Sequence, residues 1–193
     1  MKELVFLLEE RSAKALLESL LPRILNENIQ FRCIPFEGKQ DLEKQLSRKI
    51  KAYQNGQARF IVLRDQDSHS DCAALKRKLL DMCHISGKGE KCRVCIACTE
   101  LETFYLADLQ AVEQALKLDG LARLQLTRKF RTPDMLGNPS KELSLLTNYR
   151  YEKVSGSRII GQYLDVDNER SPSFLNLLST IRRLETELIK STR

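Results

Sequence analysis

The stretch Phe60-Ile61-Val62-Leu63-Arg64-Asp65-Gln66-Asp67 joins a short apolar run to two carboxylates that stand one residue apart. Four consecutive apolar residues predict a buried strand. Because alternate side chains of an extended chain share a face, we expect Asp65 and Asp67 to point together. Ligands of open α/β sheets bind just beyond the carboxyl ends of strands, and paired carboxylates there favour a hard cation such as Mg²⁺. An ordinary turn or a helix cap explains the same two residues equally well.

Strand-like and helix-like patterns alternate on both sides of this stretch. The predicted strands cover residues 4–8, 29–35, 59–63 and 93–97, and the predicted helices begin after Ser12 as a cap, after Gly38, after the Asp65/Asp67 pair and after Thr99. Such alternation is typical of a mainly parallel sheet covered by helices. The predicted fold class is therefore α/β and Rossmann-like, with about four strands.

Beyond Asp108 the alternation stops, and Gly and Pro divide the chain into short pieces. Ser171-Pro172 is typical of a helix start, and the helix that follows has one apolar stripe from Phe174 to Leu188. We therefore predict two units, an α/β core in residues 1–108 and a C-terminal helical appendage in residues 109–193 that packs on the core.

The composition indicates a globular chain with one sizeable core, since 42% of the 193 residues are hydrophobic. We expect a cytoplasmic protein without membrane contact, because no apolar run approaches a membrane span and the first residues do not form a secretory signal. The net charge of +6 is modestly basic. Clusters such as residues 76–78 and 128–131 could follow phosphates or could be solvated helix faces.

Cys92, Cys95 and Cys98, with Cys83 as a fourth ligand, have the spacing of a metal or cluster site. The run overlaps the predicted strand at residues 93–97, however, where a spacing of three places thiols on opposite faces. We interpret these cysteines as reduced core residues.

Acidic residues follow three of the four predicted strands. They are Glu9 and Glu10 after the first strand, Asp65 and Asp67 after the third, and Glu100 and Glu102 after the fourth. The ends of parallel strands meet at one edge of a sheet, so acids far apart in sequence converge there. This convergence predicts a metal–carboxylate site. Simpler interpretations remain for single residues: Glu9 or Glu10 could favour a helix N-terminus, and Glu102 could complete a capping box with Thr99.

These segments resemble the TOPRIM fold, whose signature is a Glu after the first strand and an Asp-x-Asp after a later one. More closely, the chain resembles the bacterial TOPRIM-like family known as domain of unknown function 4276. The segments that carry the resemblance are residues 5–9, 60–67, 100–108, 155–158 and 171–174. The resemblance thus extends over most of the chain.

The resemblance implies that Glu9 is a general acid/base and that Asp65 and Asp67 hold Mg²⁺, with Mn²⁺ as an alternative ion. It also implies that Glu100 and Glu102 are outer members of the metal site. The family pattern has Gly after the first-strand Glu, where this chain has Glu10. This departure leaves open whether Glu9 or Glu10 points into the site.

The leading functional hypothesis is a divalent-metal-dependent nuclease that hydrolyses DNA or RNA. No motif places a Tyr or Ser beside the acids, which favours hydrolysis over a covalent intermediate. His69 could assist, although a lone His there is typical of a solvent-facing loop. The resemblance implies an effector of a bacterial anti-phage or toxin-like module with a partner ATPase encoded nearby.

Two other classes of protein fit the same residues. One is a non-catalytic TOPRIM-like module that binds a metal or nucleotide in order to dock or regulate a partner ATPase. The other is a structural interaction protein whose acids are caps and turns. The sequence does not distinguish DNA from RNA and does not indicate an oligomeric state.

Overall fold

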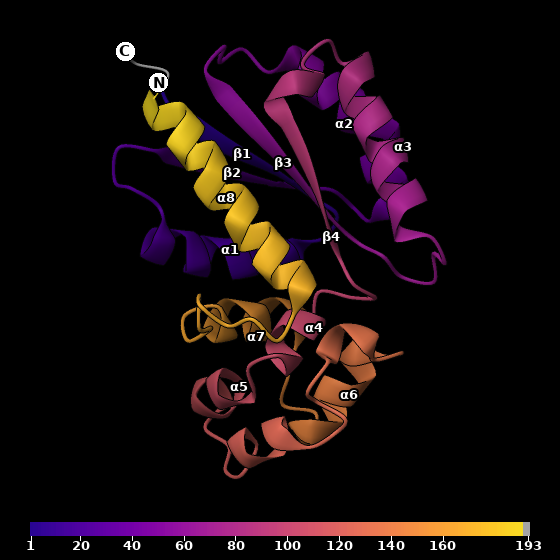
Figure 1. The fold of residues 1–193 in the computed structure, drawn as a ribbon, viewed down its shortest axis with the longest axis vertical. Helices are drawn as coiled ribbons and strands as arrows, with labels where there is room; N and C mark the ends of the chain where they lie inside the picture. Colours follow the sequence, from indigo (N-terminus) through magenta and orange to yellow (C-terminus); the bar gives the residue numbers. More distant parts are fainter. Residues whose placement is uncertain (191–193) are drawn as a thin grey trace.

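The computed structural model describes residues 1–190, which form a four-stranded parallel sheet in the order β2-β1-β3-β4 (Figure 1). The strands are β1 (Glu3–Leu8), β2 (Gln30–Pro35), β3 (Ala58–Asp65) and β4 (Cys92–Ala97). Leu8 pairs with Leu63, and Asp65 pairs with Ala97. The ends of β1, β3 and β4 therefore lie at one edge, and the predicted parallel α/β sheet is confirmed.

Two layers of helices cover the sheet. They are α1 (Arg11–Ile24) with α8 (Pro172–Lys190) on one face, and α2 (Lys39–Ala52) with α3 (Cys72–Ile85) on the other. Alternate side chains of β1 point to opposite faces of the sheet, so Phe6 packs on the side of α1 and Leu7 on the side of α2. All six residues of β1 are buried, as a central parallel strand requires.

Short helices occupy the region beyond the carboxyl ends of the strands (Figure 1). They are α4 (Thr103–Leu106), α5 (Leu109–Leu116), α6 (Pro139–Leu146) and α7 (Lys153–Ile160), with 3-10 turns at Ala122–Leu126 and Pro133–Met135. A further 3-10 turn, Gly89–Lys91, lies at the other edge of the sheet, directly before β4. The chain then returns across the sheet as α8, which shares a hydrophobic core with α1 and α5. The division of the chain after residue 108 stays a prediction.

The first turns of three helices show which side chains act as caps. Asp108 caps α5 by accepting a hydrogen bond from the Ala111 amide at 3.0 Å. Ser171 accepts one from the Phe174 amide at 3.1 Å at the start of α8. The predicted cap at Ser12 is wrong, because α1 already begins at Arg11 and the Ser12 hydroxyl donates to Glu10 instead. The turn after β1 is therefore tighter than the sequence pattern indicated.

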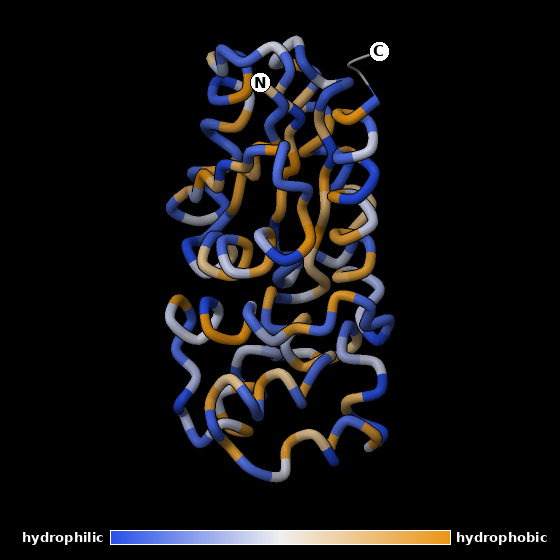
Figure 2. Tube along the Cα trace, turned by 90° about the vertical axis from the view of Figure 1, so that its left-hand side faces the viewer, coloured by the Kyte–Doolittle hydropathy of each residue, from blue (hydrophilic) through white to orange (hydrophobic). Residues whose placement is uncertain are grey.

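Hydrophobic residues gather on the strands and the inward sides of the helices (Figure 2). Cys92 and Cys95 lie in different hydrophobic clusters on opposite faces of β4, and the cysteines are free thiols. Among residues 1–190, none of the helices combines the length and apolar character that a membrane span needs.

Candidate metal and catalytic site

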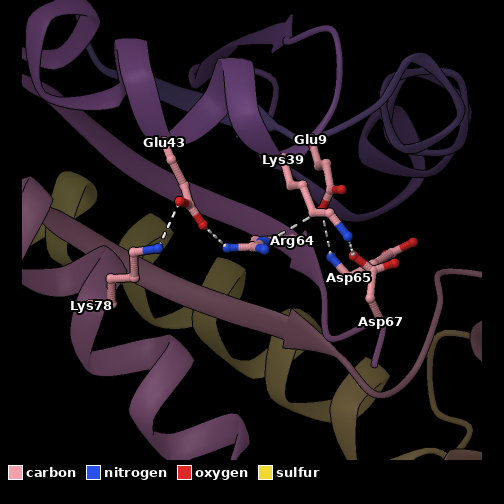
Figure 3. A network of polar contacts seen from close by, with 7 residues as sticks. All are labelled: Glu9, Lys39, Glu43, Arg64, Asp65, Asp67 and Lys78. Atoms are coloured by element: carbon pink, nitrogen blue, oxygen red, sulfur yellow. Dashed lines mark hydrogen bonds and ion pairs between the residues drawn. The ribbon is translucent and has the colours of Figure 1, made fainter. Parts of the chain in front are cut away.

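Glu9 directly follows β1 and faces the end of β3. The residue is only 6% exposed, and its carboxylate accepts a hydrogen bond from the Asp65 amide at 3.1 Å (Figure 3). The neighbouring Glu10 lies on the outer side, where its carboxylate contacts Lys153 at 3.4 Å. Of the two glutamates, Glu9 is therefore the one that points toward the Asp-x-Asp segment.

Burial raises the pKa of Glu9, and the negative charge of Asp67 raises it further. The hydrogen bond from the Asp65 amide and the charge of Arg64 act in the opposite direction but do not cancel the effect. A carboxyl group with a raised pKa takes up and releases a proton closer to neutral pH than an ordinary glutamate.

Asp65, the last residue of β3, shares its surroundings with Glu102. Burial raises the pKa of Asp65 well above its usual value, and the charges of Glu102 and Glu9 add to this shift. Burial also raises the pKa of Glu102, which is 1% exposed. One carboxylate oxygen of Glu102, Oε2, is buried and has no hydrogen-bond partner in the described part of the chain. These two acids repel each other and gain from a cation.

Asp67 is placed by a turn rather than by the strand. Strand β3 ends at Asp65, and Asp67 has a left-handed backbone with φ of 54°. Its amide donates to the carbonyl of Thr99 at 2.7 Å, and its carboxylate forms an ion pair with Lys39 at 3.1 Å (Figure 3). The argument from strand alternation was therefore wrong for Asp67, although Asp67 still lies near enough to raise the pKa of Glu9.

Glu100 has a different role from the other acids. Its carboxylate accepts a hydrogen bond from the Ser140 amide at 2.7 Å, at the first turn of α6. This contact satisfies a free amide of the helix start. The capping box proposed for Glu102 and Thr99 is not formed, since Glu102 bonds to Tyr151 and Thr99 has a left-handed backbone.

Beyond the effect of burial, the charge of Asp67 raises the pKa of Glu9, and the charges of Glu9 and Glu102 raise that of Asp65. The acids thus form a row in the order Asp67, Glu9, Asp65 and Glu102. We call these four residues the carboxylate row. Within residues 1–190, no three His, Cys, Asp or Glu side chains are close enough to hold a metal ion as they stand. The metal-binding role predicted for these four residues and for Glu100 stays a prediction. Glu100 is turned toward α6.

Arg64 lies beside the carboxylate row as a buried cation inside an apolar strand. It is 5% exposed, and its Nε atom is 3.7 Å from the carboxylate of Glu9. Its other contact is a charged hydrogen bond to Glu43, which also binds Lys78 at 2.7 Å (Figure 3). Arg64 therefore joins Glu9 to the surface of α2 and α3.

Two tyrosines lie beside the acids, which sequence motifs did not indicate. The Tyr151 hydroxyl donates a hydrogen bond to Glu102 at 2.9 Å. Tyr105 is fully buried, and burial together with the charges of Glu102 and Asp65 raises its pKa. Burial raises the pKa of both phenols far above the usual value, so neither forms a phenolate readily. Tyr151 serves as a hydrogen-bonding group and Tyr105 as a packing group, and both are poor nucleophiles.

Gly156 in α7 makes room for the Tyr151 ring, because a Cβ atom there would lie 2.5 Å from Tyr151 Cδ2. Alanine normally stabilises a helix interior relative to glycine. We expect Gly156→Ala to do the opposite and to reduce the free energy of unfolding by about 1–3 kcal/mol through overpacking. Urea denaturation measures this change, with Ser155→Ala on the exposed side of α7 as the control. Stabilisation by Gly156→Ala would contradict the close packing.

The raised pKa values of Glu9, Asp65 and Glu102 make stability depend on pH. Above the ordinary carboxyl values near 4–4.5, the folded protein binds more protons than the unfolded chain, so stability falls as pH rises. We expect the Tm in EDTA to be higher at about pH 5.5 than at about pH 8. The lowered pKa values of Asp41, Glu43 and Asp71 act only below this window. Thermal melts across this range check the sign, and a Tm that rises with pH would contradict it.

Comparison with solved structures finds a similar fold in the C-terminal region of the Burkholderia pseudomallei OLD protein. The two chains share 17% sequence identity with a TM-score of 0.53, and the match covers 94% of this chain and 98% of that one. At this identity the likeness concerns the fold alone. No curated protein matches the chain. The family described as domain of unknown function DUF4276 matches residues 8–182. Since this range includes most of the sequence, the chain belongs to the DUF4276 family.

Proposed function

We propose that this protein is a divalent-metal-dependent nuclease that hydrolyses phosphodiester bonds of nucleic acid. The observation that carries the proposal is the carboxylate row, in which acids that follow β1, β3 and β4 converge, with the Glu9 carboxylate 3.1 Å from the Asp65 amide and the charges of Glu9 and Glu102 acting on Asp65. The resemblance of these segments to TOPRIM domains supports the same assignment, and the fold shared with the OLD protein region is consistent with it.

The residues fit a divalent cation by their chemistry. Carboxylate oxygens are the ligands that Mg²⁺ and Mn²⁺ prefer. Asp65 and Glu102 are close enough to repel, and the buried Oε2 atom of Glu102 has no hydrogen-bond partner in the described residues. Asp65 with Glu102, and Asp67 with Glu9, are the groups that would hold such ions.

A bound divalent ion would neutralise the scissile phosphate and lower the pKa of an attacking water. Glu9 would exchange the proton, because it is buried, has a raised pKa and is held by the Asp65 amide. The buried tyrosines would keep the site dry around Glu102. Hydrolysis needs no protein nucleophile in this arrangement.

Two open pockets flank Glu9 and give a phosphate chain room to approach. One pocket of about 360 Å³ contains Asp67, Lys39 and the exposed His69. The other, of about 290 Å³, contains Glu10, Arg11 and Lys153. Each pocket carries a cation that could bind phosphate while the carboxylates meet the reacting group.

The cellular setting follows from the family resemblance. We propose that the protein works in the cytoplasm as an effector of an anti-phage or toxin-like module and that a partner ATPase releases its activity. The helices within residues 109–190 would supply surface for that partner or for nucleic acid.

The test is incubation of the purified protein with transfer RNA, single-stranded DNA and plasmid DNA under Mg²⁺ and under Mn²⁺. The experiment is repeated with the product of the adjacent gene. Cleavage that needs the metal and stops with EDTA is expected for at least one substrate. Cleavage that persists in a folded Asp65→Asn, Asp67→Asn double variant would point to a contaminating nuclease and contradict the proposal.

A second candidate function rests on the ion pairs at the site. Lys39 forms an ion pair with Asp67 at 3.1 Å, and Arg64 forms one with Glu9 at 3.7 Å. Side-chain cations of the protein therefore already pair with two acids of the carboxylate row. A module of this kind could bind a metal or nucleotide without cleavage and dock a partner ATPase. Metal binding that depends on Asp65, together with intact substrates in every condition above, would favour this second function.

A further inference from the structure

Most of the net positive charge belongs to one segment, residues 121–163, which we call the basic segment. It contains eight Lys or Arg residues and three Asp or Glu residues, against a net charge of +6 for the chain. It includes α6 and α7 and lies beyond the carboxyl edge of the sheet (Figure 1). A basic segment next to an acidic site fits a polyanionic substrate, one phosphate of which reaches the acids.

Tyr149 is the most exposed aromatic residue of this segment, with 74% of its surface accessible. Asn148 and Tyr149 both have left-handed backbones, with φ of 49° and 59°. A bulky side chain seldom adopts this conformation. The turn is nevertheless fixed, because the Tyr149 amide donates to the Ser144 carbonyl at 2.7 Å and the Arg150 amide donates to the Thr147 carbonyl at 3.0 Å. The aromatic ring is thus held outward on a rigid support.

The turn is directly linked to the carboxylate row. Tyr151, two residues after Tyr149, donates its hydroxyl hydrogen bond to Glu102 at 2.9 Å. Arg150, the residue between Tyr149 and Tyr151, has an exposed side chain. An aromatic face and a cation are therefore presented within a few residues of a buried member of the site.

We propose that Tyr149 is a stacking platform for an unpaired base of single-stranded nucleic acid, with Arg150 on the adjacent phosphate. The inference deepens the proposed function, because it specifies the substrate class of the same site. An exposed ring stacks on a base face, and base faces are accessible in single strands but covered in a duplex. Phosphate contacts by the basic segment would add affinity without sequence preference.

The test measures binding without cleavage. Fluorescence anisotropy in EDTA gives the affinity of the wild-type protein for labelled nucleic acids of about 16 nucleotides per strand. The three ligands are single-stranded DNA, single-stranded RNA and duplex DNA. The variants are Tyr149→Ala, Tyr149→Phe and Tyr149→Gly, of which the last suits the left-handed backbone. The matched control is Tyr163→Ala, which removes the other exposed tyrosine of the basic segment, 46% exposed, and leaves the turn at Tyr149 intact.

We expect Tyr149→Ala and Tyr149→Gly to weaken single-strand binding about 5- to 100-fold, while Tyr149→Phe and Tyr163→Ala bind within about 2-fold of wild type. Duplex binding is expected to be weaker in the wild type and unchanged by the variants. Equal losses on single strands and duplex, or wild-type affinity in both ring-deleted variants, would overturn the stacking role. Because EDTA removes the metal, these results do not depend on whether the site cleaves. If the wild-type protein cleaves no substrate but Tyr149 still contributes to single-strand binding, the result counts against the proposed function alone.

Discussion

Asp65→Asn is expected to reduce metal-dependent cleavage by about 1000-fold or more while it stabilises the metal-free protein at alkaline pH. The substitution removes a charged ligand of hard cations but keeps the size of the side chain. It also removes the charge that Glu102 and Glu9 repel in a buried setting. We expect the Tm in EDTA at about pH 8 to rise by about 3–6 °C, and to rise less at about pH 5.5, because the raised pKa of Asp65 makes its protonated form more populated at the lower pH.

Cleavage of a labelled substrate and thermal melts check both halves of this prediction. Asp81→Asn on the exposed face of α3 is the control, since Asp81 lies outside the carboxylate row. The control is expected to leave both rate and Tm unchanged. An Asp65→Asn protein with lower stability at every pH would show that Asp65 is a structural acid.

Arg64→Met is expected to lower the free energy of unfolding by about 3 kcal/mol. Arg64 and Glu9 have side chains that are 6% and 8% exposed, so removal of the cation leaves a buried carboxylate without its counter-charge. Glu43 loses its charged hydrogen bond as well. The pKa of Glu9 should then rise further, because Arg64 lowers it in the native protein.

Urea denaturation of Arg64→Met and Lys78→Met compares the loss of a buried cation with the loss of an exposed one. Lys78 binds the same Glu43, yet its side chain is 52% exposed, so Lys78→Met should cost less than about 1 kcal/mol. Equal costs for the two variants would contradict the claim that Arg64 neutralises Glu9. A shift of the acidic limb of the pH–rate profile to higher pH in Arg64→Met would support it.

The sheet and its covering helices followed from the sequence because each strand is a short apolar run with its own boundaries. Residues 4–8 and 60–63 are buried as the runs indicated, and the parallel order brings their ends to one edge. The return of α8 across the sheet concerns packing between distant segments, which periodicity does not encode. Likewise, Ser12 has the chemistry of a cap, but the preceding Glu10 already takes that position.

The acids were predicted with the right elements but with incomplete geometry. Glu9 and Asp65 meet because β1 and β3 are hydrogen-bonded neighbours, which strand-end placement anticipated. Asp67 depends on a left-handed turn, and Glu100 is drawn to the first turn of α6, which no local pattern around Glu100 indicates. Tyr151 is 49 residues from Glu102, so only the folded chain pairs them. Arg64 did carry a signal, as a charge inside an apolar strand.

We expect the carboxylate row to bind divalent metal in exchange for protons. Isothermal titration of Mn²⁺ at about pH 6.5, in two buffers with different ionisation enthalpies, gives both the affinity and the number of protons released. We expect wild-type protein to bind Mn²⁺ with net proton release, because acids with raised pKa must ionise to hold the ion. We expect Asp65→Asn to bind at least about 10-fold more weakly and to release fewer protons. Equal binding and equal proton release in wild type and Asp65→Asn, or no binding in either, would contradict the account.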